Sequence, residues 1–205
     1  MCNMEEKSVG DRKFLLLSWL DVEKQIDELA DEIVADGYPV DTIVGILRGG
    51  VIVANLLSDV LDIREIYVIG CQSYKGTKHG ELKIYHDLTL RDLRGRHVLL
   101  VDDVADTGST LEAAVAEIIK PREPRDVRTA TLLKKPWSSH VPDYCTSSTD
   151  AWIIFPWERF ETIRSVGKIL VESLGPEKAV EQLTGFSRLS RKKVASVLEF
   201  PQRTY

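Results

Sequence analysis

Residues 98–111 have the sequence VLLVDDVADTGSTL, in which an apolar run leads into carboxylates and then into a loop of small and hydroxyl residues. The apolar run predicts a buried strand, and residues 110–119 predict a helix. In the loop between them, Gly108 permits close approach of a ligand to the backbone, while Thr107 and Ser109 offer hydroxyl donors. The start of a helix also presents backbone N–H groups and the positive end of its dipole, so this stretch predicts a phosphate site.

Two adjacent carboxylates, Asp102 and Asp103, stand directly before this loop. Acidic side chains accept hydrogen bonds from ribose hydroxyls in dinucleotide sites, so a phosphate loop beside them favours a ribose 5-phosphate. Other phosphate motifs are excluded, because the sequence has no GxGxxG and no GxxxxGK followed by Ser or Thr. A DxDxT phosphatase motif is excluded as well, since Asp103 and Asp106 do not have its spacing. An ordinary capped helix would explain the hydroxyl residues but not the carboxylates.

The rest of the chain alternates between short apolar runs and helical patterns. Residues 18–35 have apolar side chains at three- and four-residue steps and predict an amphipathic helix, with Ser18 and Asp21 as its cap. Strands are expected at residues 41–47, 65–71, 97–102, 127–133 and 151–155, and helices at residues 51–61, 110–119, 176–183 and 190–198. This alternation predicts an α/β fold with a central, mainly parallel β-sheet flanked by helices. Ligands of such sheets bind beyond the carboxyl ends of the strands.

Composition and charge exclude several classes of protein. With 43% hydrophobic and 29% charged residues among 205, the chain has enough apolar material for a packed core, which excludes intrinsic disorder. The net charge of -5 argues against a basic surface for nucleic acid. No apolar run approaches the about 20 residues that a membrane span needs, and the polar start is unlike a signal peptide, so we expect a cytoplasmic protein with no membrane partner. The three cysteines have no metal-binding spacing.

Two further loops carry cations and glycines. Arg48, Gly49 and Gly50 follow the strand expected at residues 41–47, and a helix begins at once. A cation, outward-facing backbone amides and a helix start predict a second anion site, with a tight turn between strand and helix as the alternative. Residues 73–80, SYKGTKHG, form a cationic loop between two strands, and a solvated hairpin tip is the alternative there.

Residues 98–111 resemble the motif that binds phosphoribosyl pyrophosphate (PRPP) in the type I phosphoribosyltransferases, and the resemblance covers about residues 14–171. It implies the fold of that family, with Asp102 and Asp103 on the ribose hydroxyls. It also implies that Asp106 is the catalytic general base or acid at N7 of a purine, where proton removal makes N9 the better nucleophile. The residues implied to bind the ribose and the 5-phosphate are Asp102, Asp103, Ala105, Asp106, Thr107, Gly108, Ser109 and Thr110.

The same resemblance assigns the other two loops. Arg48 and Gly49 match the pyrophosphate loop of purine phosphoribosyltransferases, and a non-proline cis peptide bond is expected directly before Arg48. Ser73, Tyr74 and Lys75 match the start of a flexible lid. A closed lid would exclude water from the oxocarbenium-like centre at C1, where water would otherwise hydrolyse PRPP.

A base-recognition hood around residues 134–158 is implied by its KKP and AWIIFPWE runs, which resemble those of xanthine-guanine phosphoribosyltransferases, especially the archaeal ones. Lys135 is implied to donate to the purine O6, with Lys134 as the alternative. Trp152 is implied to stack on the base, and the Ile153 backbone to meet its 2-position. A lysine donor suits a 6-oxo group and opposes the 6-amino group of adenine.

The resemblance implies Mg²⁺ as the cofactor, because PRPP crowds anionic oxygens that a hard cation neutralises. Asp102, Asp103 and Glu158 are implied to meet the ion, through water. The predicted reaction of purine salvage transfers the 5-phosphoribosyl group from PRPP to N9 of guanine, xanthine or hypoxanthine and releases pyrophosphate. The predicted partners are PRPP, the purine base and further copies of the chain in a dimer or tetramer.

Two alternative functions stay open. One is a noncatalytic regulator that uses the PRPP site as a sensor, and the other is a phosphoribosyltransferase for adenine or a pyrimidine. A regulator would need a nucleic-acid-binding element, and the acidic chain offers only the basic cluster Arg188, Arg191, Lys192 and Lys193. We expect a phosphoribosyltransferase domain at residues 1–171 and a C-terminal helical extension at residues 172–205, whose helices serve a core or subunit contact.

Overall fold

The structure is a computed structural model that describes residues 5–9, 12–73 and 82–199. It forms two compact units, which we call the sheet unit (Val22–Asp150) and the terminal unit (Met1–Asp21 with Ala151–Tyr205). Each unit is described by itself. The units divide the chain at other positions than the boundary expected at residue 171, and that boundary stays a prediction.

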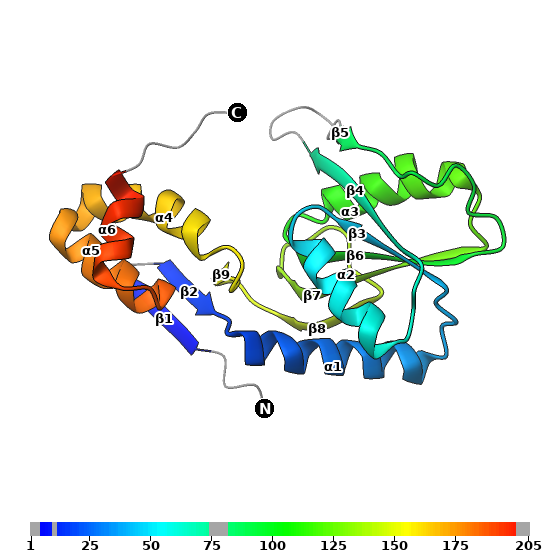
Figure 1. Cartoon of the computed structure of the whole chain (residues 1–205), viewed down its shortest axis with the longest axis horizontal. Helices are drawn as coiled ribbons and strands as arrows, with labels where there is room; N and C mark the ends of the chain where they lie inside the picture. The colour runs from blue at the N-terminus through cyan, green and yellow to red at the C-terminus, as the bar shows by residue number, and fades with distance from the viewer. Residues whose placement is uncertain (1–4, 10–11, 74–81, 200–205) are drawn as a thin grey trace. The chain divides into compact units, whose positions relative to one another are not determined.

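The sheet unit contains a six-stranded sheet with the order β5-β4-β3-β6-β7-β8 (Figure 1). The strands β4, β3, β6, β7 and β8 run parallel, and β5 pairs antiparallel with β4. The bounds are β3 Thr42–Ile46, β4 Ile66–Ser73, β5 Leu82–His86, β6 His97–Ala105, β7 Asp126–Lys134 and β8 Tyr144–Ser148. The predicted α/β class with a mainly parallel sheet is confirmed. The carboxyl ends of β3, β6 and β7 lie at one edge of the sheet, where ligands of such folds bind.

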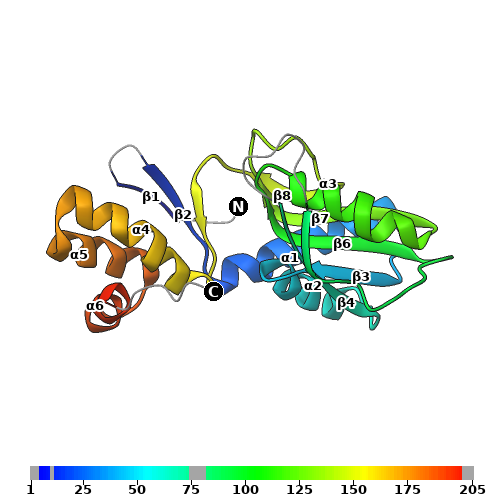
Figure 2. The same cartoon turned by 90° about the horizontal axis from the view of Figure 1, so that it is seen from above.

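Helices cover both faces of this sheet, which explains why its central strands are almost wholly apolar. Figure 2 shows α1 (Trp19–Asp36) and α2 (Gly49–Val60) on one face and α3 (Ser109–Ala114) on the other. The helix predicted at residues 110–119 is present, although it changes to a π-helical turn at Val115–Ile119 and ends in a 3-10 turn at Lys120–Arg122.

The helix α1 begins with the reciprocal cap that the sequence predicts. The Ser18 backbone N–H donates to Asp21 Oδ2 at 2.8 Å, and the Asp21 N–H donates to Ser18 Oγ at 3.2 Å. Its apolar stripe, which includes Ile26, Leu29 and Ile33, is buried. In the part of the chain that the structure describes, no helix combines the length and the apolar character needed to cross a bilayer.

The terminal unit combines a small sheet with three helices. β1 (Glu5–Val9) and β2 (Arg12–Leu16) pair antiparallel, and β9 (Trp152–Ile154) joins β2 in parallel. The helices are α4 Arg159–Leu174, α5 Pro176–Ser187 and α6 Arg191–Glu199. Their shared core is marked by Phe14 of β2 and Phe186 of α5, whose ring centroids are 5.0 Å apart. The two predicted C-terminal helices therefore pack in one core with the N-terminal hairpin.

The strand predicted at residues 151–155 exists, but its place in the central sheet was wrong. It is β9, which pairs with β2 so that Phe14 lies opposite Trp152. The apolar run at residues 14–17, for which no strand was predicted, provides the partner edge. In the central sheet, the place beside β7 is taken by β8, whose sequence YCTSS has no apolar alternation.

Candidate active site

The ends of β3 and β6 bring the two predicted anion loops together. β6 runs on to Ala105, past its predicted end at residue 102, so Asp103 lies in the strand together with Asp102. Successive side chains of a strand point to opposite faces. Asp103 lies against Gly49 of α2 and is only 8% exposed, whereas Asp102 lines a pocket together with residues of α3 and has its Oδ1 near Gly50.

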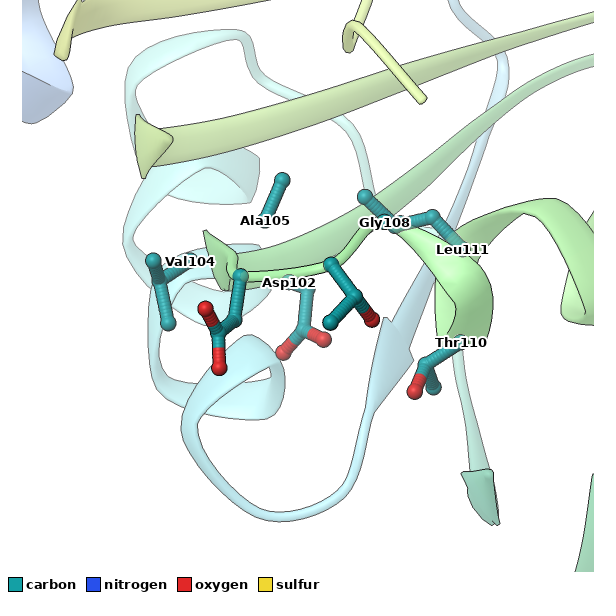
Figure 3. A pocket seen from close by; sticks show the side chains of 8 residues that line it. Asp102, Val104, Ala105, Gly108, Thr110 and Leu111 are labelled. Atoms are coloured by element: carbon teal, nitrogen blue, oxygen red, sulfur yellow. The ribbon is translucent and has the colours of Figure 1, made fainter. Parts of the chain in front are cut away.

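This pocket of about 290 Å³, partly open to solvent, lies over the end of β6 and the start of α3 (Figure 3). Gly108 stands directly before α3 with a φ of 82°, which favours glycine. Thr107 Oγ1 and Ser109 Oγ are 2.8 Å apart, so two hydroxyls lie together in the loop. The pocket is lined by Asp102, Val104, Ala105, Asp106, Thr107, Gly108, Thr110 and Leu111. These include every residue predicted to bind PRPP in this stretch except Asp103 and Ser109.

The predicted pyrophosphate loop follows β3. A cis peptide bond joins Leu47 to the exposed Arg48, as the resemblance implied. Gly49, the first residue of α2, lies so close to the Asp103 carboxylate that a Cβ on Gly49 would overlap Asp103 Oδ2. A Cβ on the next residue, Gly50, would overlap the Val101 carbonyl oxygen of β6. Glycines at these two positions therefore let the cationic loop approach the acidic end of β6.

Lys135 lies beside the candidate catalytic residue Asp106. Its backbone N–H donates to the Ala105 carbonyl at 2.9 Å, and its side chain is only 9% exposed. Burial lowers the pKa of Lys135, while the carboxylates of Asp106 and Asp150 act in the opposite direction. The alternative, Lys134, is the last residue of β7, is half-buried and pairs in register with Ala105.

Sequence reasoning missed one side chain of this site, Trp137. Its indole Nε1–H donates to Asp106 Oδ1 at 3.0 Å, and the Lys135 ammonium lies 5.6 Å from the centroid of its ring. The only signal in the sequence was its position two residues after Lys135. This position alone does not reveal the contact, because the contact joins two loops that are far apart in the sequence, one after β7 and one after β6.

The remaining predicted residues lie on other elements. Ser73 is the last residue of β4, while Tyr74 and Lys75 of the predicted lid lie outside the described residues. Trp152, Ile153 and Glu158 belong to the terminal unit, the first two on β9 and Glu158 directly before α4. Trp152 is 46% exposed, Ile153 is buried and Glu158 is half-buried. Their roles stay predictions.

Residues 16–160 match the phosphoribosyl transferase domain, so the chain belongs to the phosphoribosyltransferase family. It is 29% identical over 152 residues to a xanthine-guanine phosphoribosyltransferase of Idiomarina loihiensis, a match that covers 73% of this chain and 89% of the relative. A xanthine-guanine phosphoribosyltransferase of Cereibacter sphaeroides is 36% identical over 121 residues, which cover 57% of this chain and 68% of that protein.

Among solved structures, the fold is similar to that of a purine phosphoribosyltransferase from Pyrococcus horikoshii. The sequence identity is 39% and the TM-score 0.62, and the match covers 70% of this chain and 93% of the other. The predicted family and the predicted fold are therefore confirmed.

Proposed function

We propose that this chain transfers the 5-phosphoribosyl group from PRPP to N9 of a 6-oxopurine, namely guanine, xanthine or hypoxanthine, and releases pyrophosphate. The observation that carries the proposal is the meeting of two anion loops at one sheet edge, where Gly49 lies against Asp103 and the pocket begins at Asp102. Membership of the phosphoribosyltransferase family and the xanthine-guanine relatives support the same reaction.

PRPP would be bound by groups of complementary chemistry. The Asp102 and Asp103 carboxylates accept hydrogen bonds from the ribose hydroxyls. The loop from Asp106 to Thr110 offers backbone N–H groups and hydroxyls to the 5-phosphate. Arg48 supplies a cation to the pyrophosphate, and Gly49 leaves its backbone accessible.

The purine would be bound between an acceptor and a donor. Asp106 accepts the proton from N7, which raises electron density at N9, the atom that attacks C1 of the ribose. Lys135 donates to O6, and its partly buried ammonium is held beside Asp106. Adenine would turn its 6-amino donor toward this lysine, so the pair favours a 6-oxopurine.

Residues of the site also fit Mg²⁺. This ion is normally held by one or two carboxylates together with substrate phosphates, and it then neutralises charge on the leaving pyrophosphate. Asp102 in the pocket and Asp103 beside Gly49 are such carboxylates. Within the described residues, no cluster of three or more His, Cys, Asp or Glu side chains could hold an ion by itself. The site therefore suits an ion that arrives with PRPP, and we include Glu158 as an outer ligand through water.

The test is nucleotide formation from PRPP and Mg²⁺ with guanine, hypoxanthine, xanthine, adenine, uracil and orotate. We expect product with at least one 6-oxopurine and none with the other three bases. Asp106→Asn should lower kcat by at least about 100-fold, because general base catalysis contributes at least that much, while PRPP binding is retained. Arg48→Ala should instead weaken binding of PRPP and pyrophosphate.

Two results would contradict the proposal. Product formed only with adenine or a pyrimidine would assign a different acceptor to the same fold. PRPP binding without turnover of any base would support the regulator, and the basic cluster Arg188, Arg191, Lys192 and Lys193 would then be tested for duplex binding.

A further inference from the structure

The segment that follows β7 contacts three consecutive residues of the PRPP loop. The Lys135 N–H donates to the carbonyl of Ala105 at 2.9 Å. The indole N–H of Trp137 donates to the carboxylate of Asp106 at 3.0 Å. Ser139 donates to the carbonyl of Thr107 twice, from its backbone N–H at 2.9 Å and from its hydroxyl at 2.8 Å. We call residues 135–140 the brace loop.

The brace loop is itself held in place. The Ser138 N–H donates to the Lys135 carbonyl at 3.1 Å, and its hydroxyl donates to the His140 carbonyl at 2.7 Å. His140 Nε2 lies 3.2 Å from Thr129 Oγ1 of β7. His140 also covers Gly108, because a Cβ added to Gly108 would lie 2.6 Å from the Cβ of His140. Trp137 therefore projects from a loop with a defined backbone, although its side chain is 56% exposed.

The chemistry of the indole determines what its bond to Asp106 can do. An indole N–H is a donor and never an acceptor, so it pairs only with an acceptor oxygen. In this structure that acceptor is Oδ1 of Asp106, the candidate general base. A bond at Oδ1 also fixes the plane of the carboxylate and with it the direction of Oδ2. The ring of the same tryptophan lies 5.6 Å from the Lys135 ammonium, within the range of a cation–π contact.

We propose that Trp137 is a positioning residue that holds Asp106 oriented toward N7 of the purine and holds Lys135 toward O6. This proposal rests on the proposed function. A hydrogen bond to a charged group contributes more than one between neutral groups, so loss of the indole N–H should lower kcat about tenfold. Because the indole N–H of Trp137 donates to Asp106 and its ring lies beside Lys135, the loss should fall on kcat, and the KM for PRPP should stay within about twofold.

Two substitutions separate the hydrogen bond from the packing of the ring. Trp137→Phe keeps an aromatic ring and removes the donor, whereas Trp137→Gln keeps a side-chain N–H donor and removes the ring. We expect kcat to fall about tenfold in Trp137→Phe and to recover partly in Trp137→Gln. The matched control is Trp19→Phe, which changes a tryptophan of similar exposure, 54%, and should retain wild-type kcat. Equal kcat in wild type and Trp137→Phe would overturn the proposal, as would an equal loss in both Trp137 variants.

A second measurement tests the contact without catalysis. The chain has four tryptophans, so its ¹H–¹⁵N spectrum should contain four indole signals, and the one lost in Trp137→Phe belongs to Trp137. That signal should shift in Asp106→Asn and stay in place in Asp92→Asn, which changes a surface carboxylate paired with Arg94. An unmoved signal in Asp106→Asn would disprove the contact. If the wild-type protein formed no nucleotide while the signal shifted, the proposed function would fail and the contact would stand.

Discussion

At the scale of single residues, Gly108 combines a positive φ with close packing. Its φ is 82°, and an added Cβ would lie 2.6 Å from the His140 Cβ and 2.7 Å from the His140 backbone nitrogen. Gly95 has nearly the same φ, 81°, but has nothing within 4 Å of an added Cβ. A side chain at either position would therefore cost the same backbone strain, but only a side chain at Gly108 would also clash with a neighbour.

We expect Gly95→Ala to lower the free energy of unfolding by about 1 kcal/mol, the cost of a left-handed alanine. Gly108→Ala should lower it by about 2–4 kcal/mol, because overpacking against His140 adds to the same cost. It should also weaken PRPP binding, since the brace loop, which contains His140, would have to move away from the loop that follows β6. Urea denaturation and PRPP titration measure both effects. Equal destabilisation by the two substitutions would show that His140 yields freely.

A buried thiol gives the protein a defined response to alkaline pH. Burial raises the pKa of Cys71 to about 12, because the thiolate would lie in an apolar core. A pKa raised on folding means that the native state retains its proton while the unfolded state loses it, so the Cys71 contribution to stability falls between pH 9 and pH 12. In Cys71→Ala this loss should be absent.

The difference in unfolding free energy between wild type and Cys71→Ala should therefore change by about 1 kcal/mol from pH 8 to pH 10, in favour of the variant. Comparing the two proteins cancels the alkaline response of Tyr144, whose pKa burial raises to about 12 as well. A difference that stays constant with pH would mean that the Cys71 thiol ionises equally in both states.

At the level of elements, apolar strands were predictable and polar or edge strands were not. β3, β6 and β7 were found because burial on both faces requires continuous apolar runs. β8 was missed because a strand at the edge of a sheet can carry polar residues. β5 was missed because Leu82–His86 is short and comes directly after a polar loop. The strand β9 was found but given the wrong partner, since three residues carry no information about which edge they join.

The same distinction applies to the site. Contiguous residues from Asp102 to Thr110 could be assigned to one candidate site because a pocket built on one strand-to-helix connection is lined by residues of one motif. Trp137 could not, because its partner Asp106 lies on another loop and the hydrogen bond depends on how β6 and β7 align. The roles given to Trp152 and Glu158 rest on the resemblance alone.

The approach of α2 to β6 gives an element-level prediction. A Cβ on Gly50 would lie 2.8 Å from the Asp102 Cα and closer still to the Val101 carbonyl oxygen, which are backbone atoms of the central strand. Gly50→Ala should therefore move the start of α2 away from β6. We expect a loss of about 1–3 kcal/mol in unfolding free energy and weaker pyrophosphate binding.

The control for this prediction is another helical glycine with open space. Gly185 of α5 has nothing within 4 Å of an added Cβ, so Gly185→Ala should stabilise the protein by up to about 1 kcal/mol through helix propensity. Opposite signs for the two alanine substitutions, measured by urea denaturation, would support close packing of α2 on β6. A neutral or stabilising Gly50→Ala would contradict it.

At the scale of the whole molecule, each of the two units contains a hydrophobic core formed by its own described residues. One lies between the central sheet and α3 in the sheet unit and contains Leu100. The other lies between β2, β9 and the helices α4, α5 and α6 in the terminal unit and contains Leu183. Both leucines are fully buried, so truncation of either should cost about 2–5 kcal/mol.

If each core stabilises its own unit, the two truncations should act on different parts of the chain. Leu183→Ala should speed native-state hydrogen exchange at amides of α4, α5 and α6 more than at amides of β6. The substitution lowers the free energy needed to open the terminal unit and leaves that of the sheet unit unchanged. Leu100→Ala should reverse this order. Exchange measured by mass spectrometry on peptides from β6 and α5 compares the two units in one sample. Uniform acceleration in both variants would mean that the units unfold as one cooperative structure, and the pocket at Asp102 would then depend on the C-terminal helices for its stability.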